Sequence, residues 1–202
     1  MAGQSPGTNG TTLDVEDLAA DHADAVALCS NGRHKDAAVV FAHTLRGCRE
    51  LFGAQHDATL TVAGNLAVTQ LLAGRRRDGL SLLESNLSDR VRAWGDEDPR
   101  TLTARDAYAV AMRLAGKVDD AVNLSTLVTA QRTRVLGPTH PDTFTSRMGL
   151  VQARAAAGDV GSASALLTSA LSDAEQALGV RHRSTRALLD CGHHLGLIRT
   201  DP

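Results

Sequence analysis

Hydrophobic positions along most of this chain recur three or four residues apart, which is the spacing of an α-helix. One apolar face is predicted for a helix over about residues 57–73: Leu60, Ala63, Leu66, Ala67 and Leu71. A second face is predicted over about 76–94: Leu80, Leu83, Leu87, Val91 and Trp94. No window alternates with a period of two and is rich in β-branched residues, so no strand is expected. The pattern predicts an all-α protein.

Glycines interrupt these helical runs at a constant interval of 42 residues. One series is Gly53, Gly95, Gly137 and Gly179. The other series is Gly32, Gly74, Gly116 and Gly158. Glycine just beyond an amphipathic run commonly ends a helix, so two series predict two helices in each unit. A fixed period of this kind is the signature of a repeat array.

Helix-start signals follow the first glycine series. In His140-Pro141-Asp142-Thr143 and Asp98-Pro99-Arg100-Thr101, proline stands where the first helical residue is expected, and its missing N–H has no cost there. Asp98 is expected to cap its helix. We therefore predict a flexible tail over residues 1–12 and a solenoid over 13–198, with hairpins at 13–54, 55–96, 97–138 and 139–180 and a closing helix at 183–198.

Two further columns of residues at the 42-residue interval have a constant size. The column before the end glycine is always large and apolar: Phe52, Trp94, Leu136 and Leu178. We expect it to hold the next helix onto the stack. The column five residues after the mid-unit glycine is always small: Ala37, Gly79, Ala121 and Ala163. Small residues predict a close crossing of the two helices in each hairpin.

The junction Leu136-Gly137-Pro138-Thr139-His140-Pro141-Asp142-Thr143, within a 42-residue helix–turn–helix unit, resembles the kinesin-light-chain type of tetratricopeptide repeat (TPR). The resemblance covers about residues 13–198. It implies a right-handed superhelical solenoid, whose first helices line a concave groove that binds peptides or protein segments. First-helix asparagines of the family can hold an extended peptide, and this chain keeps only Asn65 in that column.

Counting back from the mid-unit glycines gives the side chains expected in the groove. They make a mildly apolar surface with a threonine row and one charged spot, Asp106 with Arg113. The predicted partner-binding residues are His22, Val26, Thr61, Val68, Leu71, Thr103, Asp106, Val110, Arg113, Thr145, Met148 and Gln152. A segment with spaced apolar anchors would suit this surface. Alternatively, the valines only pack between helices and the threonines only belong to the first helical turns.

Composition narrows the class of partner. With 21 Lys and Arg against 23 Asp and Glu, the formal charge of −2 argues against general nucleic-acid binding. Cys29, Cys48 and Cys191 form no CxxC pair and are expected to be free thiols in a reducing compartment. No signal peptide and no run of about 20 apolar residues is present, so a cytoplasmic protein without a membrane span is expected. Two lysines against nineteen arginines, with abundant alanine, are typical of a high-GC bacterium.

The sequence contains none of the motifs GxSxG, P-loop or GxGxxG after a strand, so neither catalysis nor a cofactor is expected. His56, His140 and His182 would lie on adjacent units about 10 Å apart, too far to share one metal ion. Cys191, His193 and His194 lack a metal-binding spacing on a helix. We therefore expect no metal site.

Arginines also stack in columns: Arg90 with Arg132, Arg92 with Arg134, and Arg105 with Arg147. They would either receive an acidic partner or pair with the chain's own carboxylates. The leading hypothesis is a protein- or peptide-binding scaffold or adaptor, with a possible regulatory role. The alternative is a self-associating structural module, such as a homodimer, and an enzyme or metal-binding protein ranks last.

Overall fold

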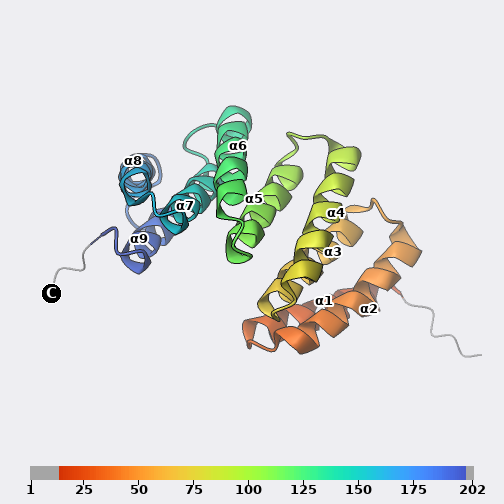
Figure 1. Ribbon diagram of the computed structural model, residues 1–202. Helices are drawn as coiled ribbons and strands as arrows, with labels where there is room; N and C mark the ends of the chain where they lie inside the picture. Colours follow the sequence, from red (N-terminus) through yellow and green to blue (C-terminus); the bar gives the residue numbers. More distant parts are fainter. Residues whose placement is uncertain (1–13, 199–202) are drawn as a thin grey trace, which may run out of the picture.

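The computed structural model describes residues 14–198, and all regular secondary structure in that range is α-helical (Figure 1). The helices are α1 Val15–Ser30, α2 His34–Phe52, α3 Asp57–Leu72, α4 Arg76–Trp94, α5 Pro99–Leu114, α6 Val118–Leu136, α7 Pro141–Ala156, α8 Val160–Leu178 and α9 Arg183–His194. The two helices predicted over 57–73 and 76–94 agree with α3 and α4 within one residue. The predicted tail, 1–12, lies outside the described residues.

The helices stack as consecutive hairpins in a single curved array, from α1 at one end to α9 at the other (Figure 1). Each helix packs on the next, and α3, α5, α7 and α9 also contact one another in succession. No pair of even-numbered helices within residues 14–198 makes comparable contact. Equivalent points are closest on the inner side of a curved stack, so the odd-numbered first helices form the inner row. The predicted all-α solenoid is confirmed.

The mid-unit glycines end the first helices through a repeated hydrogen-bond pattern. Gly74 adopts a φ of 85°, which only glycine adopts readily. Beyond it, the Arg75 N–H reaches back to the Gln70 carbonyl at 2.8 Å, so a carbonyl of the last turn is satisfied. The same backbone bond closes the first helices of the other three hairpins, where Arg33, Lys117 and Asp159 donate to Leu28, Met112 and Arg154.

The junction between hairpins combines a helix stop with a clip. Gly137 adopts φ 93° and ψ 160°, a conformation essentially restricted to glycine. The Thr143 hydroxyl donates to the Gly137 carbonyl at 2.8 Å. Equivalent bonds join Thr59 to Gly53 at 2.8 Å and Thr185 to Gly179 at 2.9 Å. We call this contact the Gly–Thr clip. In the remaining copy, the buried Thr101 hydroxyl has no hydrogen-bond partner among the described residues.

Helix capping explains the column of histidines. The Nδ1 atoms of His56, His140 and His182 accept hydrogen bonds from the backbone N–H two residues further on, at 3.2, 3.1 and 3.2 Å. Asp98 fills the same role at the start of α5, where its carboxylate accepts from the Arg100 N–H at 2.9 Å. These side chains satisfy N–H groups that the helix leaves without partners.

The small column lies where the two helices of a hairpin cross. Ala37, Ala121 and Ala163 are fully buried. At Gly79 the approach is closer still, since an added Cβ would lie 2.8 Å from the Ala67 carbonyl oxygen and 2.6 Å from the Leu71 Cγ. The predicted close crossing is therefore confirmed, and in the second hairpin it excludes even a methyl group.

The closing helix is shorter than predicted, because α9 ends at His194 rather than at residue 198. Gly196, at φ 67°, ends it one turn earlier than the other first helices end. The chain then folds back, and Ile198 packs where a Cβ on Gly192 would lie 2.6 Å from its Cδ1 atom. Leu195, Leu197 and Ile198 thus join the core at the end of the array, which includes the buried Leu167.

Two glycine-to-alanine changes should separate close packing from helix propensity. We expect Gly79→Ala to lower the free energy of unfolding by about 1–3 kcal/mol, because the methyl group would overlap the α3 backbone. Gly149→Ala on α7 should raise it by about 0.5–1 kcal/mol, since no neighbouring described atom lies within 4 Å of the added Cβ. Urea unfolding followed by circular dichroism measures both, and equal effects would contradict the close crossing.

Candidate functional site

Two hollows open on the inner row at positions related by one repeat. The first hollow, about 440 Å³, lies between α1, α2 and α3, and His22, Cys48 and Thr61 are among its lining residues. The second hollow, about 330 Å³, lies between α3, α4 and α5, and Arg90 and Thr103 are among its lining residues. Cys48 and Arg90, like Thr61 and Thr103, are 42 residues apart. The hollows therefore repeat with the hairpins and follow the groove.

The structure brings four of the predicted groove residues into these hollows: His22, Thr61, Val68 and Thr103. None of the twelve predicted residues is buried. The others are exposed or half-buried along the array: Val26, Leu71, Asp106, Val110, Arg113, Thr145, Met148 and Gln152. That these side chains bind a partner stays a prediction.

The valine column bears on the alternative that these residues only pack between helices. Val26, Val68 and Val110 are 43%, 39% and 37% exposed, so a large part of each side chain faces solvent. The threonine column is mixed. Thr103 and Thr145 donate to the carbonyl groups of Pro99 and Pro141 at 2.9 and 3.2 Å, as first-turn residues do, but both remain exposed.

The predicted charged spot of Asp106 with Arg113 is wrong as a pair. Seven residues along α5 separate the two side chains by about 10 Å, two helical turns. Asp106 accepts a hydrogen bond from Ser146 and pairs with Arg132, both at 2.7 Å. Arg113 instead donates to Gln152 at 3.2 Å. Each therefore makes its own contact with the neighbouring hairpin.

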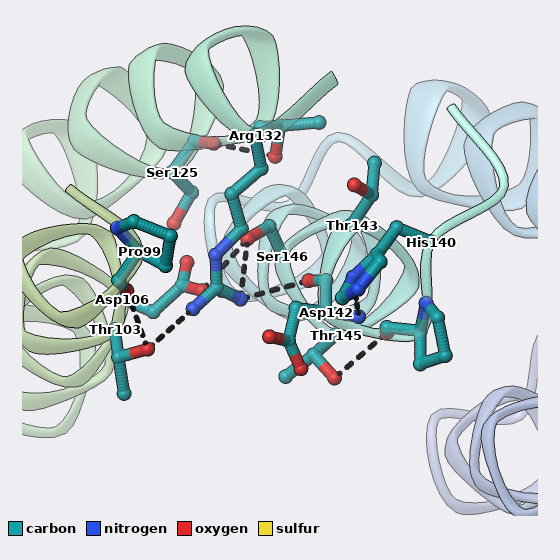
Figure 2. A network of polar contacts seen from close by, with 12 residues as sticks. Pro99, Thr103, Asp106, Ser125, Arg132, His140, Asp142, Thr143, Thr145 and Ser146 are labelled. Carbon is teal, nitrogen blue, oxygen red and sulfur yellow. Dashed lines mark hydrogen bonds and ion pairs between the residues drawn. The ribbon is translucent and has the colours of Figure 1, made fainter. Parts of the chain in front are cut away.

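Arg132 occupies the place that corresponds to the two hollows in the next pair of hairpins (Figure 2). It is only 2% exposed and joins three helices. Its guanidinium donates to the Asp142 carbonyl at 2.7 Å, to the Ser146 hydroxyl at 3.2 Å and to the Thr103 hydroxyl at 2.9 Å. With the Asp106 carboxylate these contacts make up the Arg132 network, which links α5, α6 and α7.

Burial dominates the electrostatics of the Arg132 network. It raises the pKa of Asp106 above the ordinary value of 3.8, although Arg132 and the Ser146 hydrogen bond act in the opposite direction. Sequence reasoning treated Arg132 only as one of a stacked column. The useful signal was the column of Asp106, whose other members are His22, Gly64 and Met148, so an acid stands there once.

Comparison with known proteins agrees with this geometry. The tetratricopeptide repeat family model matches residues 25–58. The fold is that of a TPR solenoid. A comparison with curated proteins found no match.

Solved structures with this fold include TPR proteins related to kinesin light chain. The chain is similar to the nearly identical TPR-like repeats titled as kinesin light chain from Podospora anserina, with a TM-score of 0.73 and 24% identity over 89% of this chain and 86% of that one. It is also similar to BtubC (BKLC) from P. vanneervenii, with a TM-score of 0.66 and 15% identity over 93% and 83% of the two chains. These likenesses establish the fold.

Most of the stacked arginines of the TPR solenoid pair with its own carboxylates. The pairs are Arg92 with Asp89, Arg105 with Asp96, Arg132 with Asp106, Arg134 with Glu97, and Arg147 with Asp173. Of the two readings of these columns, self-pairing holds for five members. Arg90 forms no such pair within the described residues.

The remaining candidates for chemistry are the thiols and the terminal histidines. Cys29, Cys48 and Cys191 are free, and burial raises the pKa of the Cys48 and Cys191 thiols, which makes them less reactive. Across residues 14–198, no three or more His, Cys, Asp or Glu side chains gather closely enough to hold a metal ion. No helix in the same range has the length and apolar character needed to cross a membrane.

Replacing Arg132 should destabilise the solenoid in a pH-dependent way. Arg132→Met leaves the largely buried Asp106 without its counter-charge, so we expect a loss of about 3 kcal/mol in the free energy of unfolding at pH 7. Arg92→Met, which breaks an exposed surface pair, should cost about 0.5 kcal/mol or less. Thermal unfolding of both variants measures the difference, and equal losses would contradict a structural role for the network.

The sign of the pH effect follows from the raised pKa of Asp106. Its stabilising contribution is complete below pH 3.8 and is lost as pH rises through the raised folded-state pKa, because the unfolded chain ionises first. Arg132 lowers that pKa, so Arg132→Met should raise it further. The variant should then lose more stability than the wild type between pH 4 and 7.

Proposed function

We propose that this TPR chain is a protein- or peptide-binding scaffold that receives a partner segment along its inner row of first helices. The observation that carries the proposal is the recurrence of hollows along that row at the repeat interval. A continuous segment lying in the groove would meet similar hollows in succession. Spaced side chains of the segment would fill them, as in other grooves that bind spaced anchors.

The chemistry of the groove supports a protein partner. Its exposed valines offer apolar contact area, while the neighbouring threonine hydroxyls and Asn65 offer hydrogen bonds. The first hollow is lined mainly by apolar side chains, including Leu18, Phe52 and Val62. The formal charge of −2 leaves no cationic excess for a nucleic-acid backbone. TPR folds commonly serve as protein-interaction scaffolds, and a regulatory role would follow from the identity of the partner.

Asn65 has a local role that limits one mode of binding. Its side-chain nitrogen lies 3.0 Å from the His22 Nε2 atom, so it links the first two hairpins across the groove. It lines the second hollow, and His22 lines the first. A segment that used this amide for its own backbone would have to displace the imidazole. Side-chain anchoring in the hollows is therefore the simpler mode.

Charge placed in the groove should abolish partner binding without unfolding the chain. The double variant Val68→Asp/Val110→Asp should lower the affinity for a captured partner at least about tenfold, because the carboxylates would be desolvated against apolar anchors. Val39→Asp is the matched control, since Val39 is a helical valine 70% exposed on α2, outside both hollows. Partners are captured from cells that make the protein, and affinities are measured by calorimetry.

The proposal fails if the groove variant and the Val39→Asp control recover the same partners with equal affinity. Light scattering over a concentration series checks the alternative of self-association. A dimer that the groove variant disrupts would identify a second copy of the chain as the occupant.

A further inference from the structure

Arg90 and Arg132 occupy equivalent positions on α4 and α6, 42 residues apart, but their surroundings differ. Both are buried, at 8% and 2% exposed, and both donate to the carbonyl group of the second residue in the next first helix. Around Arg132, the protein supplies a carboxylate and two hydroxyl groups. That arrangement shows what this position does with an arginine when the partners are built in.

Around Arg90 two of those partners are missing. Subtracting 42 from Asp106 gives Gly64, and subtracting 42 from Ser146 gives Ala104. The hydroxyl equivalent to Thr103 is present as Thr61, which lines the second hollow. The space that the Asp106 carboxylate fills in one pair of hairpins is thus open in the preceding pair, where the hollow measures about 330 Å³.

Part of the Arg90 guanidinium is left free to act on that space. Its Nε donates to the Asn86 side chain at 2.9 Å, and its Nη1 donates to the Arg100 carbonyl at 3.3 Å. Within residues 14–198, its Nη2 makes no hydrogen bond, and no carboxylate lies within the 4 Å of an ion pair. A Cβ on Gly64 would lie 4.0 Å from this Nη2, so the free nitrogen faces the missing side chain.

Neighbouring charges leave this nitrogen without a close partner. Arg100 also lines the hollow, but its guanidinium is held by Asp98 at 2.9 Å and lies over the Trp94 ring at 3.9 Å. Asp57 is the acidic residue of the lining, and it attracts Arg90 only from beyond ion-pair distance. A buried cation with one unfilled donor is costly unless something completes its shell.

We propose that the second hollow binds a carboxylate of the partner, supplied by a glutamate or aspartate side chain of a segment lying in the groove. The carboxylate would take the place that Asp106 takes beside Arg132, and would accept hydrogen bonds from the Arg90 Nη2 and the Thr61 hydroxyl. The apolar wall of Val68 and Leu83 suits the methylene groups of such a side chain. This inference rests on the proposed scaffold function and specifies the chemistry of one anchor.

A side chain fits better than the end of a chain because the groove continues on both sides of the second hollow. The first hollow adjoins it through the shared residues Asp57 and Thr61, and the exposed Val110 extends the row toward α7. A segment passing through would present internal residues to Arg90. Acidic specificity would then sit between two apolar contacts.

Restoring the missing carboxylate tests the complementarity without any partner. Gly64→Asp should raise the Tm by about 2–4 °C above that of Gly64→Ala, which controls for helix propensity and has room for its Cβ. The increment should disappear when each variant is combined with Arg90→Met. If Gly64→Asp is no more stable than Gly64→Ala, the hollow does not favour a carboxylate and the proposal fails.

A display library of random 12-residue linear peptides tests the binding itself. The wild type should select peptides with a glutamate or aspartate at one fixed position, and replacing that residue by glutamine or asparagine should weaken binding about tenfold. Gly64→Asp should remove the preference, while Gly64→Ala should keep it. An acidic preference that survives Gly64→Asp, or selection of a terminal carboxylate alone, would overturn the assignment.

The two proposals fail in different ways. Selected peptides that bind through Val68 and Val110 but show no acidic preference would leave the scaffold function standing and refute the carboxylate anchor. If no peptide is enriched, or if Val68→Asp/Val110→Asp binds the selected peptides normally, the groove is not a binding surface and both proposals are refuted.

Discussion

The Gly–Thr clip sets the spacing of the whole array. At each junction where it forms, glycine takes a conformation closed to other residues, and a threonine hydroxyl of the following helix binds its carbonyl at 2.8–2.9 Å. The end of one hairpin is therefore fixed against the start of the next within a single turn. Cap residues such as His140 and Asp98 then satisfy the first N–H groups of the new helix. Since the same joint recurs without insertion, residues 42 apart share equivalent backbone positions.

That equivalence makes differences between repeats informative. One buried column on the second helices reads Cys48, Arg90, Arg132 and Ala174, with exposures of 3%, 8%, 2% and 0%. The backbone accommodates a thiol, a guanidinium or a methyl group at the same place, because the adjoining first helices adjust the space. Where Asp106 and Ser146 surround the arginine, the space is filled and the hairpins are tied together. Where Gly64 and Ala104 stand, a hollow remains. Filled junctions hold the array together, and open junctions are places for a partner.

The ends of the array follow a different rule from its middle. A middle hairpin buries both faces against neighbours, whereas the last hairpin needs a cover. The chain provides it with a 12-residue helix that stops a turn early, and with an apolar end that packs back over Gly192. Ile198 thus covers core that a further repeat would bury in the middle of the array.

The sequence by itself determined the helices, their period and their boundaries, because capping, glycine stops and apolar faces are local signals. Gly137, Thr143 and Gly79 could be assigned their roles from column comparison alone. The tertiary structure decided which charged groups meet. Asp106 faces Arg132 rather than Arg113 because three helices converge there, and side chains 26 residues apart in sequence are closer than those two turns apart on α5. It also decided that α9 ends at His194, since the early stop depends on Leu197 and Ile198 finding a surface on which to pack. Contacts of this kind depend on the distances between helices, which the repeat period does not encode.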